Sequence, residues 1–436
     1  MVRNLPLSTV LVTAALMSGT AGVAAQAMPA AVDEQVEITY YNYNLASAGI
    51  GAEATQQLIA DFEAAHPNIT VNAVGVQSTE MVSRIQADMA AGIGPDVTQT
   101  IFDDLAYTID NFGAVALEDI VPPEELAAHF EGMSENGLEL GRLNGKTYAL
   151  AYTFSTPVLF YNADLFRAAG LDPNQPPRTW EELKMAGLAI EESTDARAFE
   201  AAIVGPGSGG DDWMLQSVVL SNGGRTLSED RITLTFHEPE AVEAIAMLQD
   251  LYESGVFYPG ELGSSMESMA GGQVGMYLTS SVLQAYLIAG SEGNFELRSA
   301  QMPGFGDRPA SPTNSGSGLV IHTTDPVKQR AAWELMKFMT SPEAYTVITS
   351  QIGYVPLRTD IVTDPTYLAD WVAEHPLVQP NLDQLERLEP WVAYPGPNYR
   401  QINSIMMDAM DMAVFGGVDV EATLRDAQAN AQALMP

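Results

Sequence analysis

The spacing of apolar residues alternates between strand-like and helix-like patterns along the chain. Residues 36–44 (VEITYYNYN) are rich in β-branched and aromatic side chains, which predicts a buried strand. In the next segment, EATQQLIADFEAAHP, Leu58, Ile59 and Phe62 recur at helical spacing and Pro67 ends the helix. A strand (NITVNAVGV), a helix (MVSRIQADMAAGI) and a third strand (PDVTQTIF) follow. This order predicts parallel strand pairing and an α/β fold.

The same kind of pattern starts again after Lys146. ALAYTFSTPVLFYN predicts extended chain passing into a strand, and FEAAIVG and QVGMYLTSS predict further strands. Helical spacing is present in NADLFRAAG, EELKMAGLAIEE, WMLQSVVLSNGG and PEAVEAIAMLQDLYESG, and two helices and a mostly helical tail follow. The chain has no internal repeat and no low-complexity linker. With 436 residues it is too long for one ordinary core, so we expect two α/β units with the chain crossing between them.

The first 27 residues have the three parts of an export signal. Arg3 supplies the basic region, residues 5–17 the apolar region, and Ala25-Gln26-Ala27 an A-x-A cleavage site. The apolar run is too short to span a bilayer, although a short buried helix is the alternative interpretation. The chain has no cysteine, which excludes disulfides, thiolate metal sites and a lipidated N-terminal cysteine. We therefore expect a freely diffusing periplasmic protein without a lipid anchor.

The charge of the chain excludes some partners. The formal net charge is −37, from 56 acidic and 19 basic residues. Such a surface repels nucleic acid and anionic membranes, because binding to phosphate backbones requires clustered Lys and Arg. Adaptation to a saline habitat and a genomic bias toward acidic residues explain this charge equally well, and neither identifies a ligand.

No motif in the chain predicts a catalytic or cofactor site. Residues 205–210 match G-x-G-x-x-G, but Asp211 and Asp212 follow at the helix N-terminus, where they would repel phosphate, so a glycine-rich loop with Asp as N-cap is favoured. The five histidines are scattered, and no G-x-S-x-G is present, so we expect no metal and no cofactor. Asp103 and Asp104 could form a carboxylate pair for glycoside hydrolysis, but adjacent carboxylates arise by chance in so acidic a chain.

Aromatic residues with neighbouring amides and hydroxyls give a more specific indication. Sugars are bound by aromatic faces and by planar polar groups, usually in a concave site. For any single aromatic residue a place in the core is the more common one, but as a set they favour a cleft at the loop ends of an α/β fold. The set comprises Tyr40, Tyr41, Asn42, Tyr43, Asn44, Trp213, Tyr354, Trp391, Tyr394, Asn398, Tyr399 and Arg400.

Several motifs in the order found here resemble those of one large family. FEAAHPNITV, GIGPDV, NGKTYALAYTFSTPVLFYNADLFRAAGLDP, TWEEL, SGSGLVI and IGYVPLR are similar to the carbohydrate-type extracellular solute-binding proteins of ABC importers. STPVLFYN, AGLDPNQPPRTW and GYVPL resemble the glycerol-3-phosphate-binding branch. The resemblance implies a two-lobed periplasmic-binding-protein fold of type II, with a ligand cleft between lobes joined by three crossings. These crossings are expected near Leu150, Ser311 and Pro356, which gives one lobe of residues 36–150 and 312–356 and another of 151–311 and 357–436.

The resemblance also implies ligand-binding positions. Ser155, Gly316 and Tyr354 match the branch, as does Ser281 or its neighbour Ser280. Together with Asn42 and Tyr43 from the aromatic set, the expected site residues are Ser78, Asp103, Ser155, Trp213, Ser280, Ser281, Gly316, Tyr354 and Arg400. Ser78 stands near an early tyrosine of the branch and Asp103 near its glutamate, whereas Arg400 is offset from the branch's phosphate-binding arginine. Because phosphate recognition favours a bidentate arginine, we expect a neutral sugar or polyol, with glycerol-3-phosphate or a glycerophosphodiester as the alternative.

The expected function is that of a receptor and not of an enzyme. Ligand would contact both lobes only when they are closed, and the closed monomer would then dock on the transmembrane subunits of an ABC permease. A secreted glycoside hydrolase using Asp103 or Asp104 is the competing hypothesis.

Overall fold

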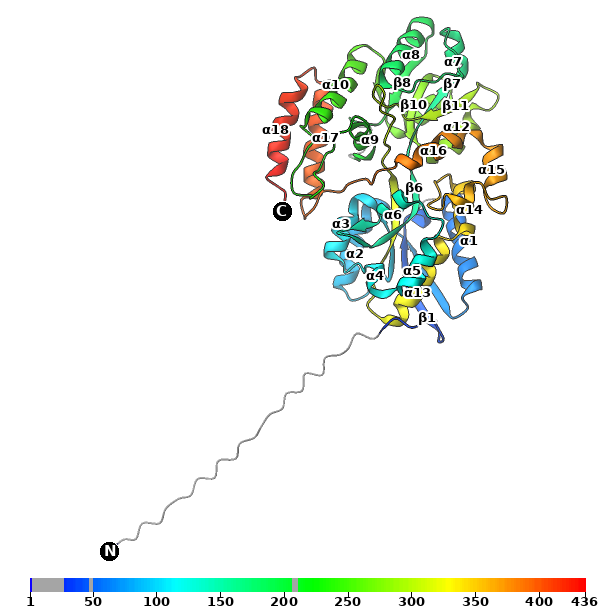
Figure 1. Cartoon of the computed structure of the whole chain (residues 1–436), viewed down its shortest axis with the longest axis vertical. Coiled ribbons are helices and arrows are strands. Elements are labelled where there is room, and N and C mark those ends of the chain that lie inside the picture. Colours follow the sequence, from blue (N-terminus) through cyan, green and yellow to red (C-terminus); the bar gives the residue numbers. More distant parts are fainter. Residues whose placement is uncertain (2–26, 47–49, 206–210) are drawn as a thin grey trace.

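Two lobes, each built around a five-stranded sheet, make up the folded part of the chain (Figure 1). This computed structural model describes residues 1, 27–46, 50–205 and 211–436. The expected export signal therefore lies almost entirely outside the described residues. Within the described part, no helix is both long enough and apolar enough to cross a membrane.

The sheet of the first lobe has the strand order β2-β1-β3-β12-β6. β1 pairs in parallel with β2 and β3, which confirms the pairing predicted for the first three strands, and β12 is antiparallel to β3 and β6. Parallel pairing requires a crossover connection, and the two predicted helices provide it. The strands are β1 (Val36–Asn42), β2 (Ile69–Gly75), β3 (Val97–Ile101), β6 (Ala149–Ser155) and β12 (Ser315–Ile321).

The sheet of the second lobe has the order β11-β7-β10-β8-β9. β10 is parallel to β8 and antiparallel to β7, and β11 is the edge strand beside β7. Its strands are β7 (Pro157–Asn162), β8 (Arg197–Ala201), β9 (Phe257–Pro259), β10 (Val274–Ser280) and β11 (Leu297–Gln301). A hairpin of β4 (Arg142–Leu143) and β5 (Lys146–Thr147) precedes β6.

Helices cover both sheets and lie where the apolar spacing predicts most of the longer ones. In the first lobe they are α1 (Ile50–Ala65), α2 (Met81–Ala90), α3 (Phe102–Asn111), α4 (Leu117–Ile120), α5 (Pro123–Phe130), α6 (Glu135–Glu139), α13 (Pro326–Met339) and α14 (Pro342–Val347). In the second lobe they are α7 (Ala163–Ala168), α8 (Trp180–Ser193), α9 (Trp213–Ser221), α10 (Pro239–Glu253), α11 (Leu262–Ala270), α12 (Gln284–Ser291), α16 (Gln379–Gln384), α17 (Tyr399–Phe415) and α18 (Val420–Gln432). α15 (Ala369–Glu374) lies on the segment that leads from the first lobe to α16.

Each lobe has its own hydrophobic core. Trp333 and Tyr345 are fully buried in the first, and Trp180 and Phe199 in the second. Trp213, at the start of α9, packs against both cores and so marks where the lobes meet. Two separate cores joined by narrow crossings are the arrangement that permits hinge motion.

The chain crosses between the sheets at three places. β6 belongs to the first sheet and β7 to the second, so the first crossing is at Thr156 and not near Leu150. The second lies between β11 and β12, in residues 302–314, which include the expected Ser311. The third is spread out: Leu357 and Leu388 still pack in the core of the first lobe, and Tyr394 is already in that of the second.

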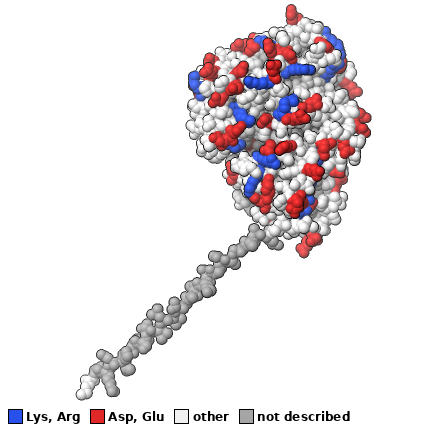
Figure 2. All heavy atoms as spheres, in the orientation of Figure 1, with Lys and Arg blue, Asp and Glu red and all other residues white. Residues whose placement is uncertain are grey.

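Acidic side chains dominate the surface, as the net charge of −37 requires. Figure 2 shows Asp and Glu over both lobes, with fewer Lys and Arg interspersed among them. No large basic face is visible on this side of the molecule.

Candidate functional site in the cleft between the lobes

A cavity of about 350 Å³ lies between the two lobes. Its walls come from the carboxyl ends of β1, β3, β6, β8 and β10 and from the start of β12, the place where open α/β sheets bind ligands. The volume falls in the range of small-molecule sites. The lining residues are Tyr43, Ser78, Thr79, Ile101, Ser155, Ala202, Asp211, Trp213, Met214, Thr279, Ser280, Val282, Leu283, Ser315, Gly316, Tyr354 and Trp391.

A network of buried polar groups holds Tyr43 at the wall of the cavity. The Tyr43 hydroxyl lies 3.0 Å from Thr153 Oγ1, and the Tyr43 backbone N–H donates to Gln99 Oε1 at 3.1 Å. Gln99 Nε2 in turn donates to Thr153 Oγ1 at 3.0 Å and to Ser317 Oγ at 2.9 Å. Gln99 is fully buried, so its amide is committed to these partners. The phenol is therefore fixed in position before a ligand arrives.

Two further contacts shape the same wall. Ser280 Oγ, on the second sheet, donates to Ser155 Oγ, on the first, at 2.7 Å. Gly316 has a φ of +113°, and a Cβ at this position would lie 2.1 Å from the carbonyl oxygen of Thr153. Only glycine meets both conditions, because it lacks a Cβ and tolerates positive φ. Desolvation and the neighbouring Tyr43 raise the pKa of Tyr354 well above its usual value, so its hydroxyl stays a neutral hydrogen-bonding group.

Carboxylates lie at one end of the cavity. Asp212 accepts from Trp391 Nε1 at 2.6 Å and from Gln216 Nε2 at 2.8 Å. Burial nonetheless raises the pKa of Asp212 to about 6. Desolvation within the cleft also raises the pKa of Asp211, and Asp104 adds to this effect. Among the described residues of the cavity wall, Asp211 is the only charged one, and the others are aromatic, aliphatic or hydroxyl-bearing.

Asp212 occupies the N-cap position of α9, as expected, but its side chain does not bond to the helix backbone. Its two carboxylate oxygens accept instead from Trp391 Nε1 and Gln216 Nε2. Residues 206–210 of the preceding glycine-rich segment lie outside the described residues.

Comparison with known proteins identifies the family of this chain. Residues 57–378 match the sequence model of the family described as bacterial extracellular solute-binding protein. The chain belongs to this family. The match covers well over half of the chain and includes strands from both sheets, so the resemblance found in the sequence motifs is confirmed.

Individual relatives are similar to half of the chain or more. A binding protein of Brucella abortus (strain 2308) is 26% identical over 389 residues, which is 86% of this chain and 88% of that protein. The sn-glycerol-3-phosphate-binding periplasmic protein UgpB of Salmonella typhimurium is 30% identical over 228 residues, half of each chain.

Two solved structures support the two-lobed fold. The cyclic alpha-maltosyl-1,6-maltose binding protein of Arthrobacter globiformis has a TM-score of 0.80 at 23% identity, covering 92% of this chain and 99% of its own. UgpB of Mycobacterium tuberculosis, in complex with glycerophosphocholine, has a TM-score of 0.77 at 22% identity, covering 92% and 98%. At this identity the likeness shows the fold alone.

Within this solute-binding fold, the structure brings most of the sequence-predicted site residues together. The seven that line the cleft are Tyr43, Ser78, Ser155, Trp213, Ser280, Gly316 and Tyr354. They come from seven separate stretches of the chain, which the fold brings together at one cleft.

The other four predicted residues lie outside the wall of the cavity. Asn42 is fully buried and holds the turn after β1: its Nδ2 donates to Tyr40 Oη at 2.6 Å, and its Oδ1 accepts from the Leu45 backbone N–H at 3.0 Å. Ser281 is buried beside a smaller neighbouring cavity. Asp103 is partly buried on α3, where desolvation and then Asp212 raise its pKa well above the usual value.

Arg400 makes an ion pair instead of facing the cavity. Its Nη2 lies 2.8 Å from Asp104 Oδ1, and its Nε donates to Tyr399 Oη at 2.8 Å. Asp104 is on α3 in the first lobe and Arg400 on α17 in the second, so this ion pair joins the two lobes. The guanidinium is thus occupied by a protein carboxylate.

The sequence did not single out several residues of the cavity wall. These are Thr79, Ile101, Ala202, Met214, Thr279, Val282, Leu283 and Ser315. Ser315 begins the SGSGLVI motif but was not selected from it, and most of the others lie at or directly after the carboxyl end of a strand. The available signal was positional: residues directly after the predicted strands of an α/β fold are expected at the cleft. Within the described residues, no group of three or more His, Asp or Glu side chains is placed to hold a metal ion.

Proposed function

We propose that the chain is a periplasmic receptor that binds a neutral sugar or polyol in the interlobe cleft and delivers it, as a monomer, to the transmembrane subunits of an ABC permease. The observation that carries the proposal is the composition of the cavity wall. It offers aromatic faces, several hydroxyls and one carboxylate, and no Lys or Arg is among its lining residues. Sugar rings pack on aromatic faces, and their hydroxyls pair with planar polar groups.

The position of Arg400 argues against a phosphorylated ligand. A phosphate in a cleft is normally held by charge-assisted hydrogen bonds, preferably from a bidentate arginine. Here the guanidinium of Arg400 is paired with Asp104. Asp211 at the wall would repel a phosphate, whereas its carboxylate oxygens can accept hydrogen bonds from sugar hydroxyls.

A glycerophosphodiester is the second candidate ligand. Its support comes from relatives: UgpB proteins named for sn-glycerol-3-phosphate binding share up to 30% identity with half of this chain, and a UgpB of the same fold was solved with glycerophosphocholine. Such a ligand would need the cleft hydroxyls of Ser155, Ser280 and Tyr354 in place of an arginine.

Binding is expected to act through closure of the cleft. Tyr43 and Gly316 come from the first lobe and Trp213 and Ser280 from the second, so a ligand touching all of them stabilises the closed arrangement. We infer that the chain works as a transport receptor without catalysis, and we expect no turnover of aryl glycosides.

A thermal-shift panel tests the proposal. Maltose, sorbitol, glycerol-3-phosphate and glycerophosphocholine are each added to the protein, and a ligand at about 100 times its dissociation constant stabilises by about 2.7 kcal/mol. We expect shifts with neutral sugars or polyols that are lost in Trp213→Ala. Shifts confined to the two phosphates would establish the second candidate instead. Trp371→Ala, in a partly buried tryptophan outside the cleft wall, is the control.

A further inference from the structure

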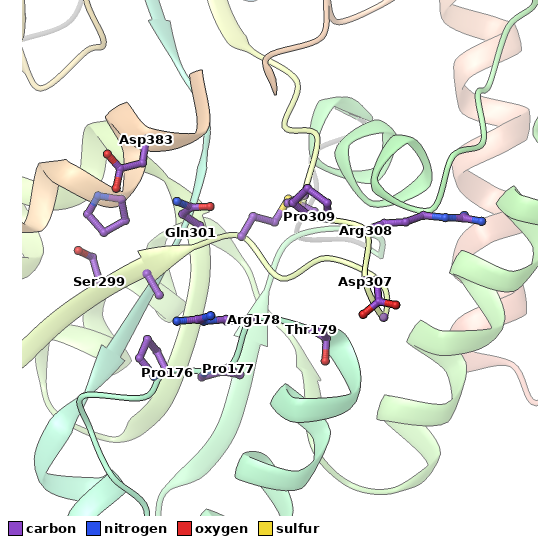
Figure 3. A pocket seen from close by; sticks show the side chains of 15 residues that line it. Pro176, Pro177, Arg178, Thr179, Ser299, Gln301, Asp307, Arg308, Pro309 and Asp383 are labelled. Carbon is purple, nitrogen blue, oxygen red and sulfur yellow. The ribbon is translucent and has the colours of Figure 1, made fainter. Parts of the chain in front are cut away.

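A second and larger cavity lies entirely in the second lobe. Its volume is about 650 Å³, and it shares no lining residue with the interlobe cleft. Three segments form it: the proline-rich residues 176–179 before α8, the end of β11 with the loop that follows, and α16 (Figure 3). Its apolar part consists of Pro176, Pro177, Ala300, Met302, Pro309, Ala310 and Pro380.

Arg178 gives this cavity a free positive charge. Every other Lys and Arg among the described residues makes an ion pair or a side-chain hydrogen bond, in a chain with 56 acidic residues. With the described residues, the guanidinium of Arg178 makes no such contact, and Figure 3 shows it at the cavity. Arg308, the other arginine of the wall, points away and bonds the backbone oxygen of Asn222. Arg178 is therefore available to an external anionic group.

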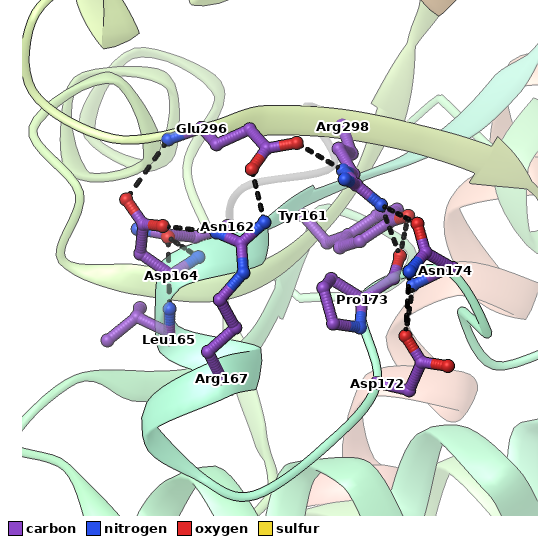
Figure 4. Close-up of polar contacts among 10 residues, drawn as sticks. All are labelled: Tyr161, Asn162, Asp164, Leu165, Arg167, Asp172, Pro173, Asn174, Glu296 and Arg298. Atoms are coloured by element: carbon purple, nitrogen blue, oxygen red, sulfur yellow. Dashed lines mark hydrogen bonds and ion pairs between the residues drawn. The ribbon is translucent and has the colours of Figure 1, made fainter.

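The backbone that carries Arg178 is held rigidly. Its N–H donates to Glu182 Oε2 at 2.7 Å, and its carbonyl accepts from the Gly304 N–H at 2.8 Å. The proline-rich loop before it is tied down as well: Tyr161 Oη and Arg298 Nη1 both donate to the carbonyl of Pro173, at 2.8 and 2.9 Å (Figure 4). A fixed wall reduces the ordering that a ligand would otherwise have to impose.

The cavity also carries a negative charge, which lies on a different segment from Arg178. Asp383, on α16, lines it, and in Figure 3 Ser299 and Gln301 are seen between the two charged groups. The Oε1 atom of Gln301 accepts from Arg387 Nη2 at 2.8 Å, which leaves the Gln301 amide N–H groups as donors toward the cavity. β11 is the edge strand of its sheet, and edge strands present backbone groups that an extended chain can pair with.

We propose that this cavity is a second binding site, which takes a di- or tripeptide with free ends. The peptide carboxylate pairs with Arg178, its ammonium group faces Asp383, and its body packs on the prolines beside the edge of β11. A simple anion could pair with Arg178 but would also meet the negative charges of Asp383 and Asp307, whereas a zwitterion satisfies both signs of charge. The volume suits a ligand of this size.

The test uses trialanine and its two charge-blocked forms, N-acetyl-trialanine and trialanine amide. Each is titrated calorimetrically into the protein without residues 1–27, the expected export signal. We expect trialanine to bind with a dissociation constant of about 1 mM or tighter. Each blocked form should bind about tenfold more weakly, the effect of losing one charge-assisted contact. Arg178→Gln should weaken the binding of trialanine about tenfold and leave that of trialanine amide unchanged. Asp383→Asn should weaken the binding of trialanine by a similar factor and leave that of N-acetyl-trialanine unchanged.

The controls separate this site from the cleft and from general charge effects. Arg308→Gln removes an arginine of the same wall that points away, and it should leave binding unchanged. Trp213→Ala alters the cleft, with which this cavity shares no lining residue, and should also have no effect. Three outcomes would each overturn the proposal. They are the absence of a heat of binding with trialanine at about 10 mM, an unchanged dissociation constant in Arg178→Gln, and loss of trialanine binding in Trp213→Ala. Arg178 and Asp383 are exposed, so both variants are expected to fold, which melting curves verify.

Discussion

At the scale of single residues, Gly316 shows how one backbone position shapes the cleft. It combines a φ of +113° with a carbonyl, that of Thr153, only 2.1 Å from where a Cβ would lie. β12 also shifts register against β6 directly after it, between Ser317 and Gly318. The sequence resemblance pointed to this glycine as a binding position, whereas the structure gives a reason for it in the backbone.

We predict that Gly316→Ala lowers the free energy of unfolding by about 3–5 kcal/mol, because strain and a clash with backbone add. Urea denaturation measures the change. The matched control is Gly145→Ala, whose φ is +76° but whose Cβ would meet nothing within 4 Å, so only the left-handed strain of about 1–2 kcal/mol is expected. Equal losses in both variants would mean that the contact with Thr153 relaxes without cost.

Asp212 predicts a pH dependence of stability. Burial raises its pKa from 3.8 to about 6, so the folded state holds this proton more tightly than the unfolded state. The resulting stabilisation is complete below about pH 4 and is lost as the pH rises toward 6 and beyond. Asp212→Asn cannot titrate, so the free energy of unfolding of this variant, relative to that of the native protein, should rise by about 2.5 kcal/mol between pH 4 and 7.

Denaturant titrations of both proteins across this pH range give the difference directly, and acidic residues that do not interact with Asp212 cancel in it. Asp103, whose pKa is raised in part by Asp212, contributes to the difference as well. Asp230→Asn is the control of opposite sign, because hydrogen bonds from Ser228 and the Ile232 N–H lower the pKa of Asp230. A constant difference between native protein and Asp212→Asn would show that Asp212 is not a titrating group in this range.

At the scale of elements, the sequence predicted most long helices and the first three strands because their periodicities are unambiguous. It did not predict the break at Thr156. Every residue of β6 and β7 is buried, and buried strands lose the alternation of apolar and polar residues that marks their ends. Nor did it predict α3, which begins at the Phe-Asp-Asp taken as an isolated carboxylate pair. The cleft could be anticipated through matched motifs, but Arg400 could not be placed, because its partner Asp104 is 296 residues away.

α16 provides a prediction at this scale, because it fastens two crossings together. The fully buried Gln384 donates to Thr156 Oγ1 at 2.8 Å and to the Pro157 carbonyl at 2.7 Å, and accepts from the Met302 N–H at 3.3 Å. Gln384→Ala should cost about 3 kcal/mol of unfolding free energy, since three buried groups lose their partner. Gln379→Ala, exposed on the same helix, should change it by less than about 0.5 kcal/mol. A cost below about 1 kcal/mol for Gln384→Ala would mean that water replaces the lost contacts.

At the scale of the whole molecule, two of the contacts between the lobes bear on their arrangement. One is the cleft, where Ser280 and Ser155 meet, and the other is the α3–α17 contact outside its wall. In the latter, Arg400 pairs with the buried Asp104, and Tyr107 stacks on Tyr399 with ring centroids 5.4 Å apart. Such a contact favours the arrangement in which it forms, whether or not a ligand is present.

Arg400→Gln should therefore shift the molecule toward an open arrangement. Because the Arg400 side chain is 55% exposed, its ion pair is worth only about 1 kcal/mol, which predicts ligand binding about fivefold weaker and a larger radius of gyration without ligand. X-ray scattering and calorimetry measure the two effects, and Arg425→Gln, in an exposed pair on α18, is the control. If Arg400 instead contacted a phosphorylated ligand, the variant would lose affinity for glycerophosphocholine alone, and its ligand-free scattering would match that of the native protein. The two readouts together thus distinguish a contact that sets the lobe arrangement from one that belongs to the ligand.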